Sequence, residues 1–123
     1  MRTMDDLEAA VAAVWAELGP GRPEVAYSAA LALATGGDHQ YPVPVRFRGV
    51  VVSVTKADVF VTHSDVPMVI EVKLADRATR EAMEQAHAYA RSLGGTTTAV
   101  VVAFPKTSAA APTIARGVAP KPV

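Results

Sequence analysis

The sequence predicts a mixed α/β domain in which helices flank a four-stranded mixed sheet. Apolar residues recur with helical spacing over the first 35 residues and alternate with polar ones over residues 43–48. They return to helical spacing over residues 77–93, before a last apolar run. Valine supplies 19 of the 123 residues, and its branched side chain favours a sheet. The element order is therefore α-α-β-β-β-α-β, an antiparallel meander followed by a helical crossover to one more strand.

Two helices are expected at the start of the chain. The first covers residues 4–18, where the apolar positions fall on one face. The second covers residues 23–35, since Pro23 suits a first helical position and Gly36 suits a left-handed stop. Glu24 lies on the inward face of this second helix, so a carboxylate accompanies its apolar stripe.

Three strands of an antiparallel meander follow. Residues 43–47 alternate between apolar and polar, and the prolines there indicate an edge strand. Arg48-Gly49 is a plausible tight turn into residues 50–62, a long or bent strand with an interruption expected around residues 55–56. Residues 68–74 form the third strand.

The end of the chain returns to helical spacing and then to one buried strand. Residues 77–93 predict a helix, and residues 99–104 lack alternation, as in a parallel strand covered on both faces. Residues 105–123 contain four prolines and are expected to be loop and tail. The sequence therefore predicts a single domain over residues 1–105 and a Pro/Ala-rich tail over residues 106–123.

Composition excludes several function classes. The chain has no cysteine, which excludes disulfides, thiolate metal sites and cysteine nucleophiles. No apolar run approaches the ~20 residues of a membrane span and the first residues do not resemble a signal peptide, so a cytoplasmic location is expected. Net charge is zero, but residues 1–40 hold 2 basic and 6 acidic residues and residues 41–123 hold 10 basic and 6 acidic. A polyanionic partner would therefore meet the second part of the chain.

Two carboxylates are expected to face each other across the second and third strands. If the turn is centred between Ser64 and Asp65, Asp58 lies opposite Glu71, with side chains roughly 5 Å apart. The same register pairs Lys56 with Lys73, Ala57 with Val72, Val59 with Ile70, Phe60 with Val69 and Val61 with Met68. Like charges placed directly opposite are destabilising by themselves. The pair is therefore explained if a hard divalent cation lies between the two carboxylates.

Each of these polar residues also has a structural interpretation. Glu71 and Lys73 can be the solvated end of a strand, with Asp58 as a surface ion-pair partner. Glu24 can be a first-turn acid favoured by the helix dipole. Gln85 and its i+4 neighbour Tyr89 can be an exposed amide and a core aromatic.

The motif around these residues resembles that of the PD-(D/E)xK nuclease superfamily. Asp58, twelve intervening residues and then Glu71-Val72-Lys73 match it, and Ala57 replaces the proline of its name. Residues 21–27, Gly-Arg-Pro-Glu-Val-Ala-Tyr, are similar to the GxxExxY signature of a small bacterial family within it. The resemblance covers roughly residues 19–105 and implies a restriction-endonuclease-like αβββαβ core.

The resemblance also implies roles for the site residues. Asp58 and Glu71, with the backbone carbonyl of Val72, would hold Mg²⁺ or Mn²⁺. Lys73 would orient the attacking water or offset charge that grows on the phosphate. Glu24 would complete the metal shell or support a second ion.

The helix that follows would supply supporting residues. Gln85 would fix the site from this helix, whereas Tyr89 is assigned to packing. Candidate phosphate contacts are the basic side chains of this helix and of the strands, namely Arg77, Arg80, Arg91, Arg46, Arg48 and Lys56.

These roles imply a metal-dependent endodeoxyribonuclease that hydrolyses phosphodiester bonds in DNA, as a homodimer or within a larger complex. Structure-selective cleavage in repair or defence is expected before sequence-specific restriction, and RNA stays open as a substrate. The alternative is a catalytically weak or inactive nuclease-fold module that binds nucleic acid or protein. A serine–histidine hydrolase is not favoured, since His39, His63 and His87 fall in a loop, a turn and a helix without an evident serine partner.

Overall fold

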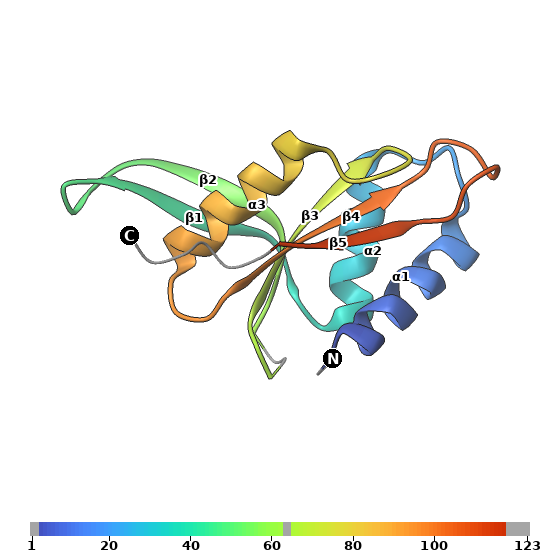
Figure 1. The fold of residues 1–123 in the computed structure, drawn as a ribbon, viewed down its shortest axis with the longest axis horizontal. Coiled ribbons are helices and arrows are strands. Elements are labelled where there is room, and N and C mark those ends of the chain that lie inside the picture. The colour runs from blue at the N-terminus through green and yellow to red at the C-terminus, as the bar shows by residue number, and fades with distance from the viewer. Residues whose placement is uncertain (1–2, 63–64, 118–123) are drawn as a thin grey trace.

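The computed structural model describes residues 3–62 and 65–117 as a five-stranded mixed sheet with helices on both faces (Figure 1). The strands lie side by side in sequence order, from β1 to β5. The elements are α1 (Met4–Leu18), α2 (Glu24–Thr35), β1 (Asp38–Phe47), β2 (Val50–Val61), β3 (Met68–Leu74), α3 (Arg80–Leu93), β4 (Thr98–Phe104) and β5 (Thr113–Arg116). Within the described ranges, no helix is long and apolar enough to span a bilayer.

Helices α1 and α2 cover one face of the sheet. Thr3 caps α1 in a reciprocal capping box with Asp6, and Gly36 ends α2 in the left-handed conformation, as predicted. Their apolar faces form a core with the sheet side chains that point the same way. The buried members of this core are Leu7, Ala10, Val11, Val14, Tyr27, Leu31, Ala32, Val59, Val61, Met68, Ile70, Val72, Val100, Val102 and Phe104.

Helix α3 packs against a second core. Thr79 caps the helix by accepting a hydrogen bond from the Ala82 backbone N–H, and Ala82, Ala86 and Tyr89 are buried. Sheet residues that alternate with those of the first core face this helix, among them Val69 of β3 and Val101 of β4. The helix forms the crossover between these two parallel strands, as the sequence predicted.

The predicted register between β2 and β3 is confirmed where the two strands pair. Val59 lies opposite Ile70, Phe60 opposite Val69 and Val61 opposite Met68. The predicted two-residue turn Arg48-Gly49 is also confirmed, with φ of 50° and 79°.

Four expectations about the strands are wrong. The sheet has five strands rather than four, because Thr113–Arg116 pairs with β4 inside the stretch expected to be loop. β1 begins at Asp38 rather than at residue 43, and β2 continues through residues 55–56 without interruption. Ala57 does not pair with Val72. The β2–β3 pairing ends at Val59 and Ile70, and Ala57, which precedes Val59, joins the core beneath α3. Strand bounds and strand pairing depend on contacts between distant segments, which the hydrophobic pattern of a few neighbouring residues does not contain.

Candidate active site

Asp58 and Glu71 lie side by side where the β2–β3 ladder ends. The backbone N–H of Asp58 donates to Oε1 of Glu71 at 3.3 Å, and the backbone N–H of Val72 donates to Oδ2 of Asp58 at 2.8 Å. Each carboxylate thus replaces a backbone carbonyl as acceptor, which explains why the two strands diverge at this point. The predicted juxtaposition of the two carboxylates is present in the structure.

Glu71 is an acid in the middle of a buried strand. Its side chain is only 3% exposed, and it shares the face of β3 that packs under α3. Burial, followed by the negative charge of Asp58, raises the pKa of Glu71 to about 8, against smaller opposing effects of the hydrogen bond from the Asp58 N–H and of the Lys73 charge. At neutral pH a pKa of about 8 favours the protonated form of Glu71 in the ion-free site. The solvated strand end that the sequence left open therefore does not describe Glu71.

Lys73 lies near the end of β3, and Glu24 of α2 bonds to the next residue of that strand. Lys73 is half-buried and follows Glu71 on the same face of the strand. Glu24 is exposed in the first turn of α2, and its Oε2 accepts a hydrogen bond from the Leu74 backbone N–H at 3.2 Å. The helix and strand are fifty residues apart in the chain, yet this bond fixes the α2 terminus beside Lys73.

The loop before α2 is held by Tyr27. Its hydroxyl donates to the Gly19 carbonyl at 2.6 Å and accepts from the Arg22 backbone N–H at 3.2 Å, while its ring stacks on Phe104 at 4.8 Å between centroids. Gly21 lies within this loop at φ +90°, a conformation that favours glycine. The spacing of glycine, glutamate and tyrosine in residues 21–27 therefore has a structural explanation: a left-handed loop, a tie to β3 and an anchor in the core.

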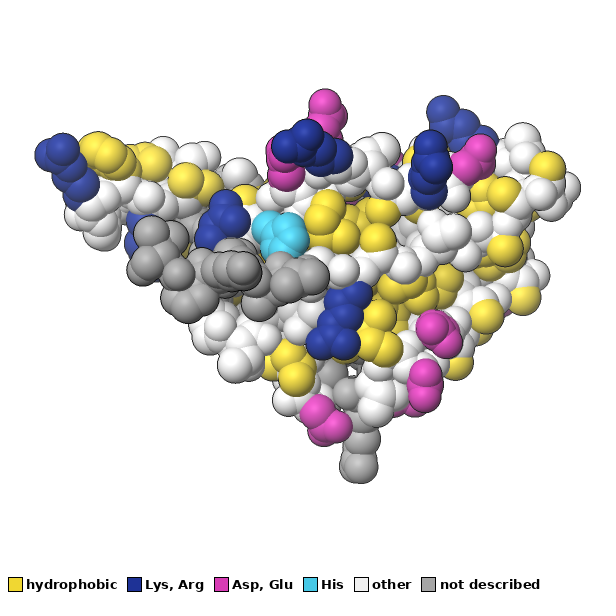
Figure 2. Space-filling model, viewed as in Figure 1, with side chains coloured by type: hydrophobic (Ala, Val, Ile, Leu, Met, Phe, Trp, Pro, Cys, Tyr) yellow, Lys and Arg dark blue, Asp and Glu magenta, His cyan; other side chains and the backbone are white. Residues whose placement is uncertain are grey.

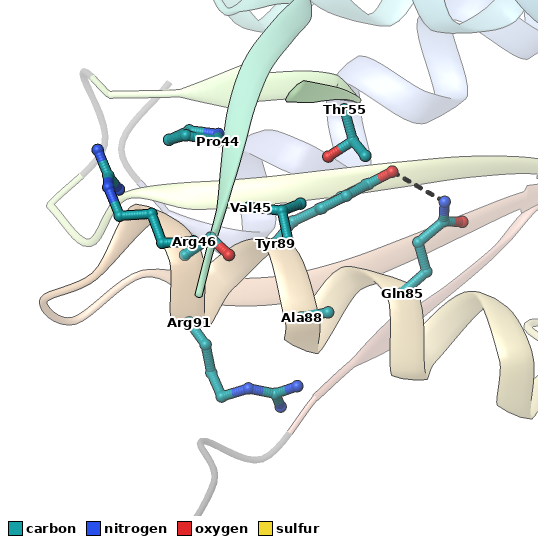
Figure 3. Close-up of a pocket in the computed structure, with 9 residues that line it drawn as sticks. Pro44, Val45, Arg46, Thr55, Gln85, Ala88, Tyr89 and Arg91 are labelled. Atoms are coloured by element: carbon teal, nitrogen blue, oxygen red, sulfur yellow. Dashed lines mark hydrogen bonds between the residues drawn. The ribbon is translucent and has the colours of Figure 1, made fainter. Parts of the chain in front are cut away.

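Gln85 and Tyr89 lie one turn apart on α3. Nε2 of Gln85 donates to the Tyr89 hydroxyl at 2.9 Å (Figure 3). Gln85 is exposed and Tyr89 is buried in the second core, as their structural interpretations predicted. Both line a groove of about 640 Å³ between α3 and the β1–β2 hairpin.

The predicted basic residues are distributed over several surfaces. Arg46 and Arg91 line the groove between α3 and the hairpin. Arg80 forms an exposed pair with Glu84 along α3 at 3.1 Å. The others, Arg48, Lys56 and Arg77, are exposed.

The histidines differ from the expectation in one respect. His39 lies in β1 rather than in a loop, and its Nε2 is 2.9 Å from the Ser28 hydroxyl, a partner that sequence spacing did not indicate. Within the described part of the chain, no carboxylate bonds to this histidine, so the pair lacks the third member of a triad. His87 lies on α3 as predicted, and His63 is outside the described residues.

The donor set fits a hard divalent cation in part. Asp58 and Glu71 offer adjacent oxygen ligands, the type that Mg²⁺ and Mn²⁺ prefer. Among residues 3–62 and 65–117, however, no three acidic or histidine side chains gather into one group. Glu24 lies instead on the backbone of β3.

The sequence comparisons give the family. The family description that matches is that of the PD-(D/E)XK nuclease superfamily, and the match covers residues 2–116. The chain belongs to the PD-(D/E)XK nuclease superfamily. No curated protein and no solved structure matches the chain. The five-stranded mixed sheet with its three helices is consistent with the restriction-endonuclease-like fold of that superfamily, and the match extends through β5.

Membership in the PD-(D/E)XK superfamily assigns a nuclease-like function. Nucleases of this superfamily generally depend on divalent metals and bind nucleic acid. In this PD-(D/E)XK chain the paired carboxylates are Asp58 and Glu71, and Lys73 follows on the same strand.

Proposed function

We propose that this chain is a metal-dependent endonuclease that hydrolyses phosphodiester bonds in DNA. The observation that carries the proposal is the pair of Asp58 and Glu71, in which a buried carboxylate with a raised pKa abuts a second carboxylate. A structural pair of this kind would be destabilising, whereas a pair that holds a cation is stabilised by it.

Asp58, Glu71 and the carbonyl of Val72 are the residues proposed to hold Mg²⁺ or Mn²⁺. A bound divalent ion polarises a phosphodiester and makes water a nucleophile near neutral pH. Glu71 would bind such an ion as the carboxylate, so it would lose the proton that its raised pKa favours in the ion-free site.

Lys73, Glu24 and Gln85 are proposed to complete the site. The Lys73 ammonium offsets negative charge that grows on the phosphate. Glu24 holds the end of β3 through the Leu74 N–H and so positions Lys73, or supports a second ion. Gln85 is tied to Tyr89 and orders the side of the site that faces α3.

The finer assignments extend this proposal. Assignment to the GxxExxY family is supported by the joint roles of Gly21, Glu24 and Tyr27 in one loop and helix. Structure-selective cleavage in repair or defence, in the cytoplasm and as a homodimer or part of a larger complex, rests on chain size and family analogy.

One observation favours a second candidate, a nuclease-fold module that binds without turnover. In the part of the chain that the structure describes, no third acidic side chain joins Asp58 and Glu71. A site with two carboxylates can bind a cation without supporting hydrolysis.

A cleavage panel distinguishes the two candidates. Wild type is incubated with supercoiled, linear, single-stranded and branched DNA and with RNA, in Mg²⁺, Mn²⁺ or EDTA. Lys73→Ala and Lys106→Ala are purified identically, the latter as an exposed lysine outside the site. Metal-dependent cleavage by wild type and Lys106→Ala but not by Lys73→Ala supports the endonuclease. Equal cleavage by all three proteins, or none by wild type, overturns it.

A further inference from the structure

The distal part of the β1–β2 hairpin forms an arm, defined here as residues 42–56. β3 pairs with β2 only at Val59–Val61, whereas the β1–β2 register continues outward to Phe47 opposite Val50. The described part of the chain contributes no third strand to the arm, and Figure 1 shows it reaching away from the rest of the sheet.

The arm exposes an unusual share of the apolar surface. Among the described residues, six of the nine large hydrophobic side chains that are exposed lie on it, and Phe47 beside the turn is 60% exposed. The six are Val45, Phe47, Val50, Val51, Val52 and Val54. Figure 2 shows hydrophobic side chains along this arm with a basic side chain at its end. Clustered apolar exposure of this kind marks a binding surface.

The charge of the arm has one sign. No acidic residue occurs between Asp38 and Asp58, and the basic residues in this interval are Arg46, Arg48 and Lys56. The Arg48 guanidinium carbon lies 5.0 Å from the centroid of the Phe47 ring. A partner for this surface must therefore combine negative charge with apolar faces, which is the chemistry of nucleotides.

The groove between the arm and α3 is the size of a small-molecule pocket. Its volume of about 640 Å³ lies in the range of pockets that bind small molecules, which suits one or two unstacked nucleotides better than a duplex. Figure 3 shows Arg46 extending from the arm and Arg91 from α3, with their guanidinium groups pointing in different directions at the border of the groove. Thr55 in the groove precedes Asp58 by three residues of β2, a distance of ~10 Å in extended chain.

We propose that this groove and the exposed apolar surface of the arm, which share Val45, bind an unpaired stretch of the nucleic-acid substrate. Paired bases hide their faces in the stack, whereas unpaired bases expose them to apolar side chains, and their phosphates meet the two arginines. The protein then selects strands beside a single-stranded region over continuous duplex. This inference rests on the proposed function, because it names the substrate class of the same site.

Binding to labelled DNA tests the inference without any need for cleavage. The full chain in EDTA is titrated, by fluorescence anisotropy, with a single strand, a fork and a blunt duplex of one sequence. We expect the single strand and the fork to bind at least about tenfold more tightly than the duplex. Arg46→Glu and Arg91→Glu should each weaken that binding at least about fivefold and, for each lost phosphate contact, reduce the salt slope by about 0.7.

Arg116→Glu is the matched control, since this exposed arginine lies on β5 at the opposite edge of the sheet. It should bind like wild type. Phe47→Ser is a second, independent variant that removes the exposed ring and should weaken single-strand binding while leaving the thermal midpoint unchanged. All the substituted side chains are exposed, so the variants should fold like wild type. The thermal midpoint of each variant checks this.

Three outcomes would overturn the inference. Equal affinity for duplex and single strand is one, and absence of DNA binding by wild type is another. The third is a change of sedimentation from dimer to monomer in Phe47→Ser with DNA binding intact, which would make the arm a contact between two copies. Cleavage assays test the proposed function separately. If duplex and fork are cut at equal rates, the single-strand inference is overturned and the nuclease function stands. If single strands are bound selectively and nothing is cut, the nuclease function is overturned and the binding inference stands.

Discussion

The backbone N–H of Asp58 donates to the Glu71 carboxylate at 3.3 Å, one residue beyond the last β2–β3 pair. Two acids from separate strands are thereby fixed within contact of each other, and one of them is almost fully buried. Without a cation, the charge of Asp58 and the burial of Glu71 make the ionised form of Glu71 unfavourable. The first two predictions follow from this relationship.

Glu71→Gln should change how stability depends on pH. The pKa of Glu71 is raised from 4.5 to about 8 in the folded chain, so folding takes up a proton between these values. The contribution of Glu71 to the free energy of unfolding therefore falls as pH rises from about 4.5 to about 8. Urea denaturation in EDTA should show the difference between Glu71→Gln and wild type growing over this range in favour of the variant. A difference that stays constant with pH would contradict the prediction.

Divalent metal should stabilise wild type and displace a proton. Mg²⁺ or Mn²⁺ binding to Asp58 and ionised Glu71 raises the thermal midpoint in proportion to the logarithm of metal concentration, and more strongly at pH 8 than at pH 6. Asp58→Asn should abolish this shift. Asp76→Asn, an exposed acid outside the site, should retain it. An equal shift in all three proteins would assign it to diffuse ion binding.

Substitutions of Glu24 should separate positioning from metal ligation. Its Oε2 accepts the Leu74 N–H, a role that glutamine can also fill but alanine cannot. If Glu24 positions Lys73, Glu24→Ala should lower kcat while leaving the metal dependence of cleavage unchanged, and Glu24→Gln should restore most of kcat. Loss of activity in both variants with a higher metal requirement would instead make Glu24 a metal ligand.

Tyr27→Phe should destabilise the fold although the ring stays in place. The variant loses the 2.6 Å bond to the Gly19 carbonyl and leaves the Arg22 N–H without its acceptor, at a cost of about 1–3 kcal/mol in the free energy of unfolding. Tyr41→Phe is the control, because within the described ranges the Tyr41 hydroxyl makes no hydrogen bond. Equal denaturation midpoints for the two variants would show that the loop is not held by the hydroxyl.

The pairing of Asp58 with Glu71 could be predicted from the sequence, because the two residues lie on neighbouring strands joined by a short turn. A turn centre between two antiparallel strands that are close in the chain fixes which of their residues face each other, and the pairs Val59–Ile70 to Val61–Met68 agree with it. Asp58 and Glu71 follow from that register by extension. The same extension failed at Ala57, because the side chain of Asp58 takes the Val72 N–H and ends the regular ladder.

Other features depend on segments that are distant in the chain. The strand Thr113–Arg116 has too few residues for a periodic signal and exists because β4 offers it an edge. The contact of Ser28 with His39 and the tie of Glu24 to Leu74 each join elements whose relative placement no spacing rule encodes.

By itself, the sequence determined the types of seven of the eight elements, the faces of the helices, and the opposition of Asp58 to Glu71, since periodicity and register are properties of neighbouring residues. The tertiary structure alone decided that Glu71 is buried, that Glu24 reaches the end of β3 and that the arm and α3 enclose a groove. Burial and enclosure depend on how separate elements pack, and packing is set by the whole chain at once.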